Sequence, residues 1–261
     1  MGKRGIVLSI AGLDPTGGAG VLLDVKVFSF FGFKGAGIPT TLTLQNTSVF
    51  QGWESVGSEY LKNALELVFS DLPVRGVKIG MIGTSENAEI IGDFLKEHRK
   101  KISWIVLDPV LKASLNYNLF SSSEFLEVLK KKVLPFVDVI TPNVSEAETL
   151  VEKTVRKRED LFKVVRKILD LGPNVVIVTG WKSSQFVWDL FYTKEKQFFL
   201  KKKKLSGSFH GTGCAFSSAL LSYLIKERNP ENAFKKAKNW LYLKLKKAEK
   251  EKLGGRLWLF L

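Results

Sequence analysis

The 261-residue chain has few of the residues that build disulfides and metal centres: one cysteine, two histidines and two methionines. A single cysteine excludes an internal disulfide framework and fits a reducing compartment, so we expect a cytoplasmic protein. His98 and His210 lie far apart in the sequence and make no metal signature. We expect His98 at a solvent-facing helix end, while His210 either approaches phosphate or has a plain loop role.

Long apolar runs, linkers and repeats are also missing. No stretch reaches the roughly 20 apolar residues that span a bilayer, so we expect no membrane partner. The apolar run after the basic start is short and continues into a glycine-rich motif, which argues against a signal peptide. No proline- or serine-rich tract divides the chain. With 45% hydrophobic residues, the sequence predicts a single large α/β domain over residues 1–261.

The chain carries a large positive charge, +14. Its lysines are scattered over amphipathic segments and the run 201–204, without the interleaved aromatic residues of a nucleic-acid site. We therefore expect a solvated lysine-rich surface and no nucleic-acid partner. The positive field would help to recruit ATP and phosphorylated substrates.

Strand-like runs alternate with helical ones, which predicts a mainly parallel sheet covered on both faces. A helix is expected after the glycine-rich motif at 12–20, because Val21, Val25 and Phe28 recur at helical spacing. The other predicted strands are 6–10, 38–44, 77–79, 102–107, 137–140 and 175–178, with an antiparallel hairpin at 186–192 and 197–203. The other predicted helices are 58–69, 85–98, 124–133, 145–152, 159–169, 213–227 and 232–252.

Four polar or glycine-rich segments each follow a predicted strand: 12–20, 45–46, 108–109 and 143–146. In open parallel sheets, ligands bind beyond the carboxyl ends of the strands. We therefore expect these segments to converge on one crevice.

The strongest candidate site is the segment from Gly211 to Cys214. Gly211, Thr212 and Gly213 lead directly into a predicted helix, so unpaired backbone N–H groups and the helix dipole would form an anion hole. At its mouth the pKa of the Cys214 thiol would be lowered. The alternative is an inert, packed cysteine.

A second glycine-rich element runs from Ser9 to Gly20. Its glycines, at 12, 17, 18 and 20, fit neither the dinucleotide fingerprint nor a Walker loop. An ordinary turn between a strand and a helix is the alternative interpretation. Asn143 to Glu146 likewise has a simple interpretation, a helix N-terminus with Ser145 as its cap.

The segments SIAGLDPTGGAGVLLDVKVFSFFG (9–32) and HGTGCAFSSAL (210–220) resemble the hydroxymethylpyrimidine kinase/phosphomethylpyrimidine kinase family of thiamine biosynthesis. Further matches follow in order: TLTLQNT, FSDLPVRGVKIGMIG, VLDPVLKAS and VDVITPNVSEAETL. The resemblance implies a ribokinase-like three-layer α/β/α sandwich with a mainly parallel central sheet. It also implies a kinase that uses ATP and Mg²⁺ to phosphorylate 4-amino-5-hydroxymethyl-2-methylpyrimidine and then its monophosphate. We expect a homodimer.

The resemblance also assigns roles to single residues. Cys214 would accept the hydroxyl proton, where many sugar kinases of the superfamily have an aspartate. Gln45 is the first choice for the pyrimidine edge, because a carboxamide offers a donor and an acceptor. Asn143, Glu146 and Asp108 would organise magnesium and the ATP phosphates. Residues expected to line the substrate pocket are Gly12, Ala19, Asp24, Met81 and Val110, with a surface charge near Lys26 as the alternative for Asp24.

Three segments depart from the family pattern: 112–115 in the expected lid, 178–182 after a predicted strand, and 254–261 at the C-terminus. Two other functions therefore stay open. One is pyridoxal kinase activity, since pyridoxal also has a hydroxymethyl group on a nitrogen ring. The other is a non-catalytic pyrimidine-binding regulatory protein that has kept the fold.

Overall fold

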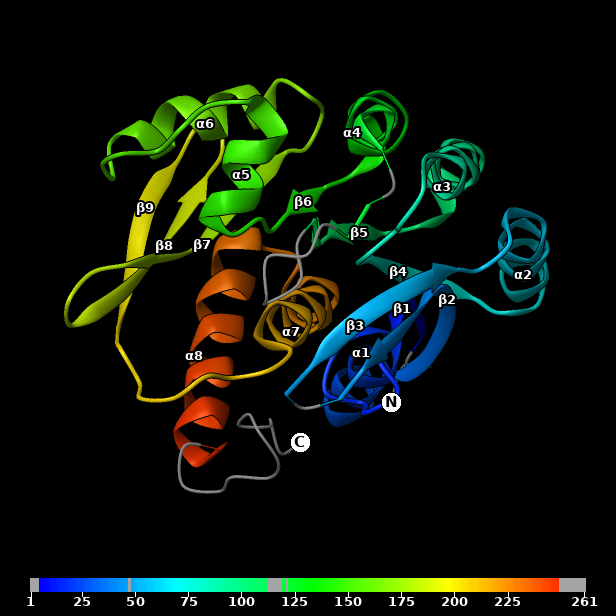
Figure 1. Ribbon diagram of the computed structural model, residues 1–261, viewed down its shortest axis with the longest axis horizontal. Coiled ribbons are helices and arrows are strands. Elements are labelled where there is room, and N and C mark those ends of the chain that lie inside the picture. Colours follow the sequence, from blue (N-terminus) through cyan, green and yellow to red (C-terminus); the bar gives the residue numbers. More distant parts are fainter. Residues whose placement is uncertain (1–4, 47, 112–118, 121, 249–261) are drawn as a thin grey trace.

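The computed structural model describes residues 5–46, 48–111, 119–120 and 122–248 (Figure 1). The expected lid segment 112–115 and the C-terminal segment 254–261 lie outside these ranges. The strands are β1 (Ile6–Leu13), β2 (Lys34–Gln45), β3 (Phe50–Ser55), β4 (Val74–Ile79), β5 (Trp104–Leu107), β6 (Val139–Ile140), β7 (Val175–Lys182), β8 (Phe186–Tyr192) and β9 (Gln197–Lys203). The α-helices are α1 (Gly20–Phe30), α2 (Ser58–Asp71), α3 (Ser85–His98), α4 (Ser123–Val128), α5 (Val144–Val151), α6 (Asp160–Leu169), α7 (Thr212–Glu227) and α8 (Pro230–Ala248).

The strands form one nine-stranded sheet in the order β3-β2-β1-β4-β5-β6-β7-β8-β9. The six strands from β2 to β7 in this order run parallel, and the pairings of β3 with β2, of β8 with β7 and of β9 with β8 are antiparallel. Helices cover both faces, so the three-layer α/β/α prediction is confirmed (Figure 1).

The two faces of the sheet pack into two cores. Leu8 and Ile10 of β1 join the core under α2 to α6, whereas Val7 joins the core under α1, α7 and α8. Burial on both faces explains why the parallel strands are continuous apolar runs rather than alternating ones. One such run, from Val175 to Val178, is almost completely inaccessible to solvent.

The differences from the predicted elements are local. Strand β3 was not predicted. It pairs antiparallel with β2 and is the edge strand on that side of the sheet. Helix α4 continues from Leu129 as a wider π turn, and α5 begins one residue earlier than expected because Asn143, not Ser145, is its N-cap.

His98 is not solvent-facing, which corrects another prediction. The centroid of its ring lies 4.5 Å from that of Phe69 and 4.9 Å from that of Phe94. Apolar contact outweighs solvation at this helix end.

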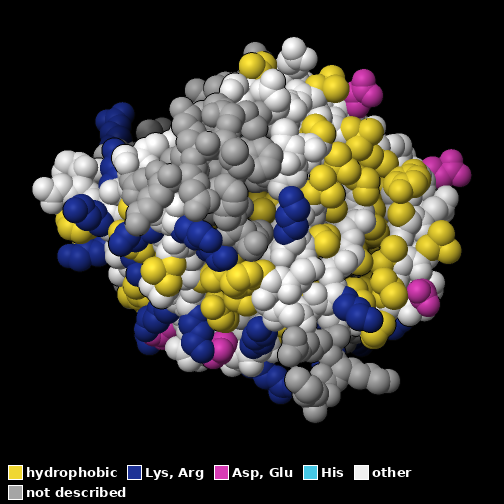
Figure 2. Space-filling model, turned by 90° about the horizontal axis from the view of Figure 1, so that it is seen from below, with side chains coloured by type: hydrophobic (Ala, Val, Ile, Leu, Met, Phe, Trp, Pro, Cys, Tyr) yellow, Lys and Arg dark blue, Asp and Glu magenta, His cyan; other side chains and the backbone are white. Residues whose placement is uncertain are grey.

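The surface has distinct regions. On the face shown in Figure 2, Lys and Arg side chains concentrate on the left and lower parts, while a broad apolar area lies to the right. Large apolar side chains that stay exposed include Leu42, Leu44 and Val49, on β2 and the turn after it. Among the described helices, none is both long and apolar enough to cross a membrane.

Candidate active site

A cavity of about 680 Å³ opens at the carboxyl ends of the parallel strands. Its volume is that of a small-molecule site. Nearly all of the site residues predicted from the sequence line it: Gly12, Ala19, Gln45, Met81, Asp108, Val110, Asn143, Glu146, Gly211, Thr212, Gly213 and Cys214. The four predicted segments therefore converge, as the strand order requires.

Glycine is required where the first motif meets the second. Gly211 has φ 71°, and a Cβ atom on it would lie 1.9 Å from the carbonyl oxygen of Gly18. Gly20 has φ 59°, and a Cβ there would lie 2.0 Å from the carbonyl oxygen of Gly12. Only glycine fits both the left-handed backbone and these close approaches. The loop at 12–20 and the start of α7 are thereby in direct backbone contact.

The start of α7 has the features of an anion hole. Gly211 is the N-cap, and among the described residues no side chain caps this helix end. The first amides of α7 therefore face the cavity with the positive end of the helix dipole behind them. Gly213 is exposed there, and a Cβ on it would lie 3.4 Å from Oδ2 of Asp108.

Cys214 is half-buried at the base of this anion hole, and its predicted thiol pKa shift is wrong in sign. Burial raises the pKa of the Cys214 thiol, and the negative charges of Asp108 and Asp24 add to the rise. Lys78 and the Gly20 N–H group lower it, but by less. Without a ligand, nearby carboxylates and low solvation outweigh the helix terminus, so the thiol stays protonated.

Asp24 does not line the cavity, which corrects the prediction. Its side chain is fully buried below the cavity, where Oδ2 lies 2.8 Å from Nζ of the equally buried Lys78. Ser9 and Ser218 donate hydrogen bonds to the same carboxylate, at 2.6 and 2.8 Å. Helix α1 turns Asp24 toward the sheet, where the ion pair with a buried lysine and two hydroxyl donors compensates the loss of water around its carboxylate.

Lys78 connects this buried pair to the site above it. Burial by itself would lower the pKa of Lys78, but the negative charge of Asp24, with Asp108 adding to it, outweighs burial and raises the pKa. The ammonium group therefore stays charged beneath the cavity. The sequence contained a signal for this buried pair: a lysine lies inside the predicted strand around Val77 to Ile79. Strands that are buried on both faces rarely contain a lysine.

Asp108 and Glu146 are the two carboxylates of the central cavity wall. Burial raises the pKa of Asp108 to about 6, and Asp24 adds to this rise while Lys78 opposes it. Burial raises the pKa of Glu146 to about 8, with Asp108 adding to it. Ser217 of α7 donates a hydrogen bond to Asp108 at 3.2 Å. A positive charge in the cavity would therefore stabilise the ionised form of both carboxylates.

Asn143 and Glu146 form a complete capping box at the start of α5. Oδ1 of Asn143 accepts a hydrogen bond from the Glu146 N–H at 3.0 Å, and Oε2 of Glu146 accepts one from the Asn143 N–H at 2.8 Å. The structural interpretation of this motif therefore holds, with Asn143 as the cap. Both side chains also line the cavity, so capping does not exclude a role in ligand binding.

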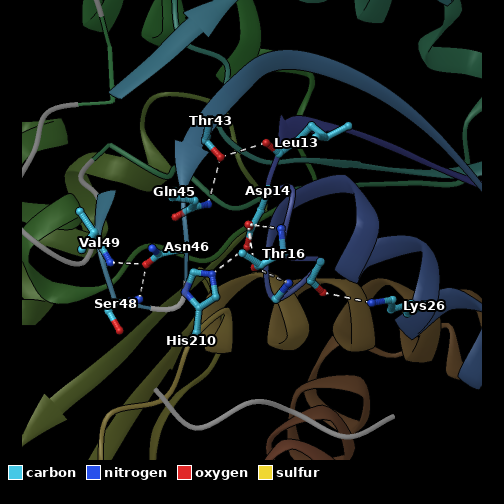
Figure 3. A network of polar contacts seen from close by, with 12 residues as sticks. Leu13, Asp14, Thr16, Lys26, Thr43, Gln45, Asn46, Ser48, Val49 and His210 are labelled. Carbon is cyan, nitrogen blue, oxygen red and sulfur yellow. Dashed lines mark hydrogen bonds and ion pairs between the residues drawn. The ribbon is translucent and has the colours of Figure 1, made fainter. Parts of the chain in front are cut away.

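Gln45 lies at the end of β2, with its carboxamide at the cavity wall (Figure 3). Nε2 of Gln45 donates a hydrogen bond to Oγ1 of Thr43 at 3.0 Å, and Thr43 in turn donates one to the Leu13 carbonyl at 3.0 Å. This chain of bonds ties the orientation of Gln45 to the end of β1 (Figure 3).

Two arrangements of cavity residues were not predicted, although His210 and the lysine run 201–204 were both noted in the sequence. Asp14 and His210 form a buried pair, described below. At the other end, the cavity is lined by the lysines Lys182, Lys202, Lys203, Lys204 and Lys238. Of these, Lys238 pairs with the buried Asp189, whose other oxygen accepts the Gly180 N–H at 2.8 Å. Lys202, Lys203 and Lys204 belong to the lysine run at the end of β9, whereas Lys182 of β7 and Lys238 of α8 join them only in the folded structure.

The carboxylates can hold a metal ion only with help from a ligand. Within the described part of the chain, no three His, Cys, Asp or Glu side chains gather as a metal cluster. Asp108 and Glu146 are two buried carboxylates with raised pKa values, and Mg²⁺ commonly uses one or two carboxylates together with water and substrate phosphates. The residues present fit that mode of binding.

Solved structures of small-molecule kinases share this architecture. The phosphomethylpyrimidine kinase of Clostridium difficile 630 superposes with a TM-score of 0.80 at 32% identity, covering 92% of this chain and 99% of that one. The Staphylococcus aureus pyridoxal kinase in complex with AMP-PCP and pyridoxal superposes with a TM-score of 0.84 at 27% identity, covering 94% and 89%. The protein is therefore a kinase with the ribokinase-like fold.

Sequence similarity narrows this class. Residues 14–256 match the family described as Phosphomethylpyrimidine kinase, and the chain belongs to that family. The hydroxymethylpyrimidine/phosphomethylpyrimidine kinase of Aquifex aeolicus is 36% identical over 247 residues, 94% of this chain and 96% of that protein. The thiamine biosynthesis bifunctional protein ThiED of Geobacter sulfurreducens is 34% identical over 248 residues, 94% of this chain and 50% of that protein.

Proposed function

We propose that this kinase phosphorylates 4-amino-5-hydroxymethyl-2-methylpyrimidine with ATP and then phosphorylates the monophosphate, in thiamine biosynthesis. The supporting observation is that Gln45 and the Cys214 anion hole line one cavity of about 680 Å³. A carboxamide for the pyrimidine edge and a proton acceptor for the hydroxymethyl group are then available to a single bound molecule.

In the proposed reaction, the substrate hydroxyl oxygen bonds to the γ-phosphorus and the bond from that phosphorus to ADP breaks. Cys214 takes the hydroxyl proton, and the amides from Gly211 to Cys214 stabilise the charge on the transferred phosphoryl oxygens. Because burial raises the pKa of the thiol, Cys214 needs a further positive charge nearby to act as a base. The charge of Lys78 below the thiol already lowers this pKa, but by less than burial raises it.

The nucleotide would occupy the cavity end lined by lysines. Lys182 of β7 and Lys202 of β9 bring positive charge from two different strands, which suits the ATP phosphates. Asp108, Asn143 and Glu146 would hold Mg²⁺, with Glu146 acting through water because its Oε2 already accepts the Asn143 N–H. When bound, the ion would neutralise phosphate charge, and the chain's own residues would orient the two substrates.

A second candidate function is pyridoxal phosphorylation. It is favoured by the likeness to the Staphylococcus aureus pyridoxal kinase structure that contains pyridoxal. The third candidate function is that of a non-catalytic pyrimidine-binding protein.

We also propose that the chain works as one kinase domain in a cytoplasmic homodimer. Leu42, Leu44 and Val49 are exposed and available for an apolar contact between the two copies.

One coupled assay separates these functions. ADP production is measured with the hydroxymethylpyrimidine, its monophosphate and pyridoxal, each with ATP and Mg²⁺, and the three values of kcat/KM are compared. We expect both pyrimidines to be preferred over pyridoxal. A preference for pyridoxal would support the second candidate, and no substrate-dependent turnover would support the binding protein. Light scattering after size-exclusion chromatography tests the dimer.

A further inference from the structure

One buried pair of side chains joins the two glycine-rich motifs. Nε2 of His210 lies 2.8 Å from Oδ2 of Asp14, although the residues are 196 positions apart (Figure 3). The two side chains are only 9% and 2% exposed. Asp14 lies in the loop before α1, and His210 directly precedes the anion hole of α7. The contact therefore joins two segments that both line the cavity.

Both oxygens of Asp14 already have partners within the protein. Oδ1 accepts hydrogen bonds from the Thr16 N–H at 2.9 Å and from the Thr16 hydroxyl at 2.8 Å, and Oδ2 faces His210. Burial by itself would raise the pKa of Asp14, but the bonds from His210 and Thr16 outweigh it and lower the pKa. Asp14 is thus a fixed, charged acceptor whose partners all belong to the protein.

The backbone around the pair of Asp14 and His210 is tightly packed. A Cβ on Gly18 would lie 2.5 Å from Cδ2 of His210, and a Cβ on Gly211 would lie 1.9 Å from the Gly18 carbonyl. A few residues further on, Gly20 lines the cavity together with Cys214. Its N–H group lowers the pKa of the Cys214 thiol. Movement of the loop at 12–20 away from α7 would therefore open the close approach of Gly18 to Gly211, three residues before Cys214.

We propose that Asp14 and His210 are positioning residues that clamp the first glycine-rich loop onto the start of α7 and thereby hold the backbone that carries Cys214 in place. The pair acts on the reaction through Cys214 and does not touch the reacting atoms. This inference rests on the proposed role of Cys214 as the proton acceptor. The clamp itself is a property of the free protein and can be measured without any substrate.

The first measurement is hydrogen exchange of the full-length protein, followed by mass spectrometry of peptides covering 12–23 and 211–220. In His210→Leu the hydrogen bond to Asp14 is lost, and we expect amides in both peptides to exchange at least about tenfold faster. His210→Gln places an N–H donor near the position of Nε2 and should restore most of the protection. His98→Leu and His98→Gln are matched controls, because the only other histidine packs on Phe69 and Phe94 outside the cavity.

The second measurement is steady-state kinetics with the hydroxymethylpyrimidine. If the clamp positions Cys214, kcat should fall about tenfold or more in His210→Leu, KM should change much less, and His210→Gln should recover kcat. Unchanged hydrogen exchange in His210→Leu would overturn the clamp. A rise in KM alone, or a loss in His210→Gln as large as in His210→Leu, would make His210 a substrate contact and overturn the positioning role.

A third variant covers the case in which His210→Leu does not fold. Asp14→Asn keeps the size of the side chain and removes its charge, so a weaker clamp should show intermediate exchange in both peptides. Exchange equal to that of the parent would again overturn the proposal. A parent protein that is inactive on pyrimidines but shows the expected exchange pattern would overturn the proposed function and leave the clamp standing.

Discussion

Nζ of Lys78 lies 2.8 Å from Oδ2 of Asp24, and neither side chain reaches solvent. The pair connects β4 to α1, and the hydroxyl groups of Ser9 and Ser218 extend the connection to β1 and α7. Directly above it, the charge of Lys78 acts on Asp108 and Cys214. The floor of the cavity is therefore both a packing junction and a source of positive charge.

Lys78→Met should destabilise the protein by about 3–5 kcal/mol, because it leaves the Asp24 carboxylate buried without its ion partner. Urea unfolding followed by circular dichroism measures the loss. The double variant Lys78→Met, Asp24→Leu should recover part of the stability, since no charge then stays buried. Lys236→Met is the control: it removes a partner of Glu227 in a pair that is partly exposed, and should cost less than about 1 kcal/mol. Equal losses for Lys78→Met and Lys236→Met would contradict this account.

Cys214→Ala should leave pyrimidine affinity nearly intact and lower kcat steeply, because positioned acid–base groups contribute about 10²–10⁴-fold. Rates at saturating substrates, together with calorimetric titration of the pyrimidine, separate the two effects. If the variant turns over at the parent rate, Cys214 is a packing residue and another group accepts the proton.

Gln45→Ala should weaken pyrimidine binding by at least about tenfold, because ring nitrogen and amino groups would be left unpaired in the cavity. ATP affinity should barely change, since the nucleotide is proposed to bind at the lysine-lined end. Gln51→Ala is a matched control, because Gln51 is an exposed glutamine on the neighbouring strand β3. Calorimetry with both ligands decides: equal losses for ATP and pyrimidine would indicate general damage to the cavity.

Glu146→Gln should raise the magnesium concentration needed for half-maximal activity, without changing pyrimidine affinity in the absence of nucleotide. The amide keeps an oxygen acceptor for the Asn143 N–H, so the cap of α5 is preserved while the charge is removed. Magnesium titrations at fixed ATP compare parent and variant. Identical titration curves would reduce this residue to its capping role.

Glu146 should also make stability depend on pH. Burial raises the pKa of its carboxyl from 4.5 to about 8 in the folded state, so between these values the folded protein binds more protons than the unfolded chain. The free energy of unfolding then falls as pH rises through this window. In magnesium-free buffer, Glu146→Gln should lose much of that slope and gain stability relative to the parent at pH 8. A parallel pH dependence in parent and variant would show that the carboxyl is not titrating there.

The sequence by itself determined the layout of the fold. Two predictions have the observed bounds: the helix Ser85–His98 and the hairpin of Phe186–Tyr192 with Gln197–Lys203. Their signals are local in the sequence, namely the spacing of apolar residues, an acidic residue in the first helical turn and residues typical of turns. The two glycine-rich motifs were likewise visible, since close backbone approach and left-handed φ values require glycine wherever they occur. The edge strand β3 was missed because it depends on pairing with β2 rather than on its own composition.

Only the tertiary structure decided the electrostatics of the site. Asp24 turns into the sheet to meet Lys78, Asp14 meets His210 across 196 positions, and the pKa of Cys214 rises where a helix N-terminus by itself would lower it. Each outcome depends on which charges and how much protein surround a group in space. Those quantities are set by long-range packing, whereas a sequence window reports only the chemistry of near neighbours along the chain.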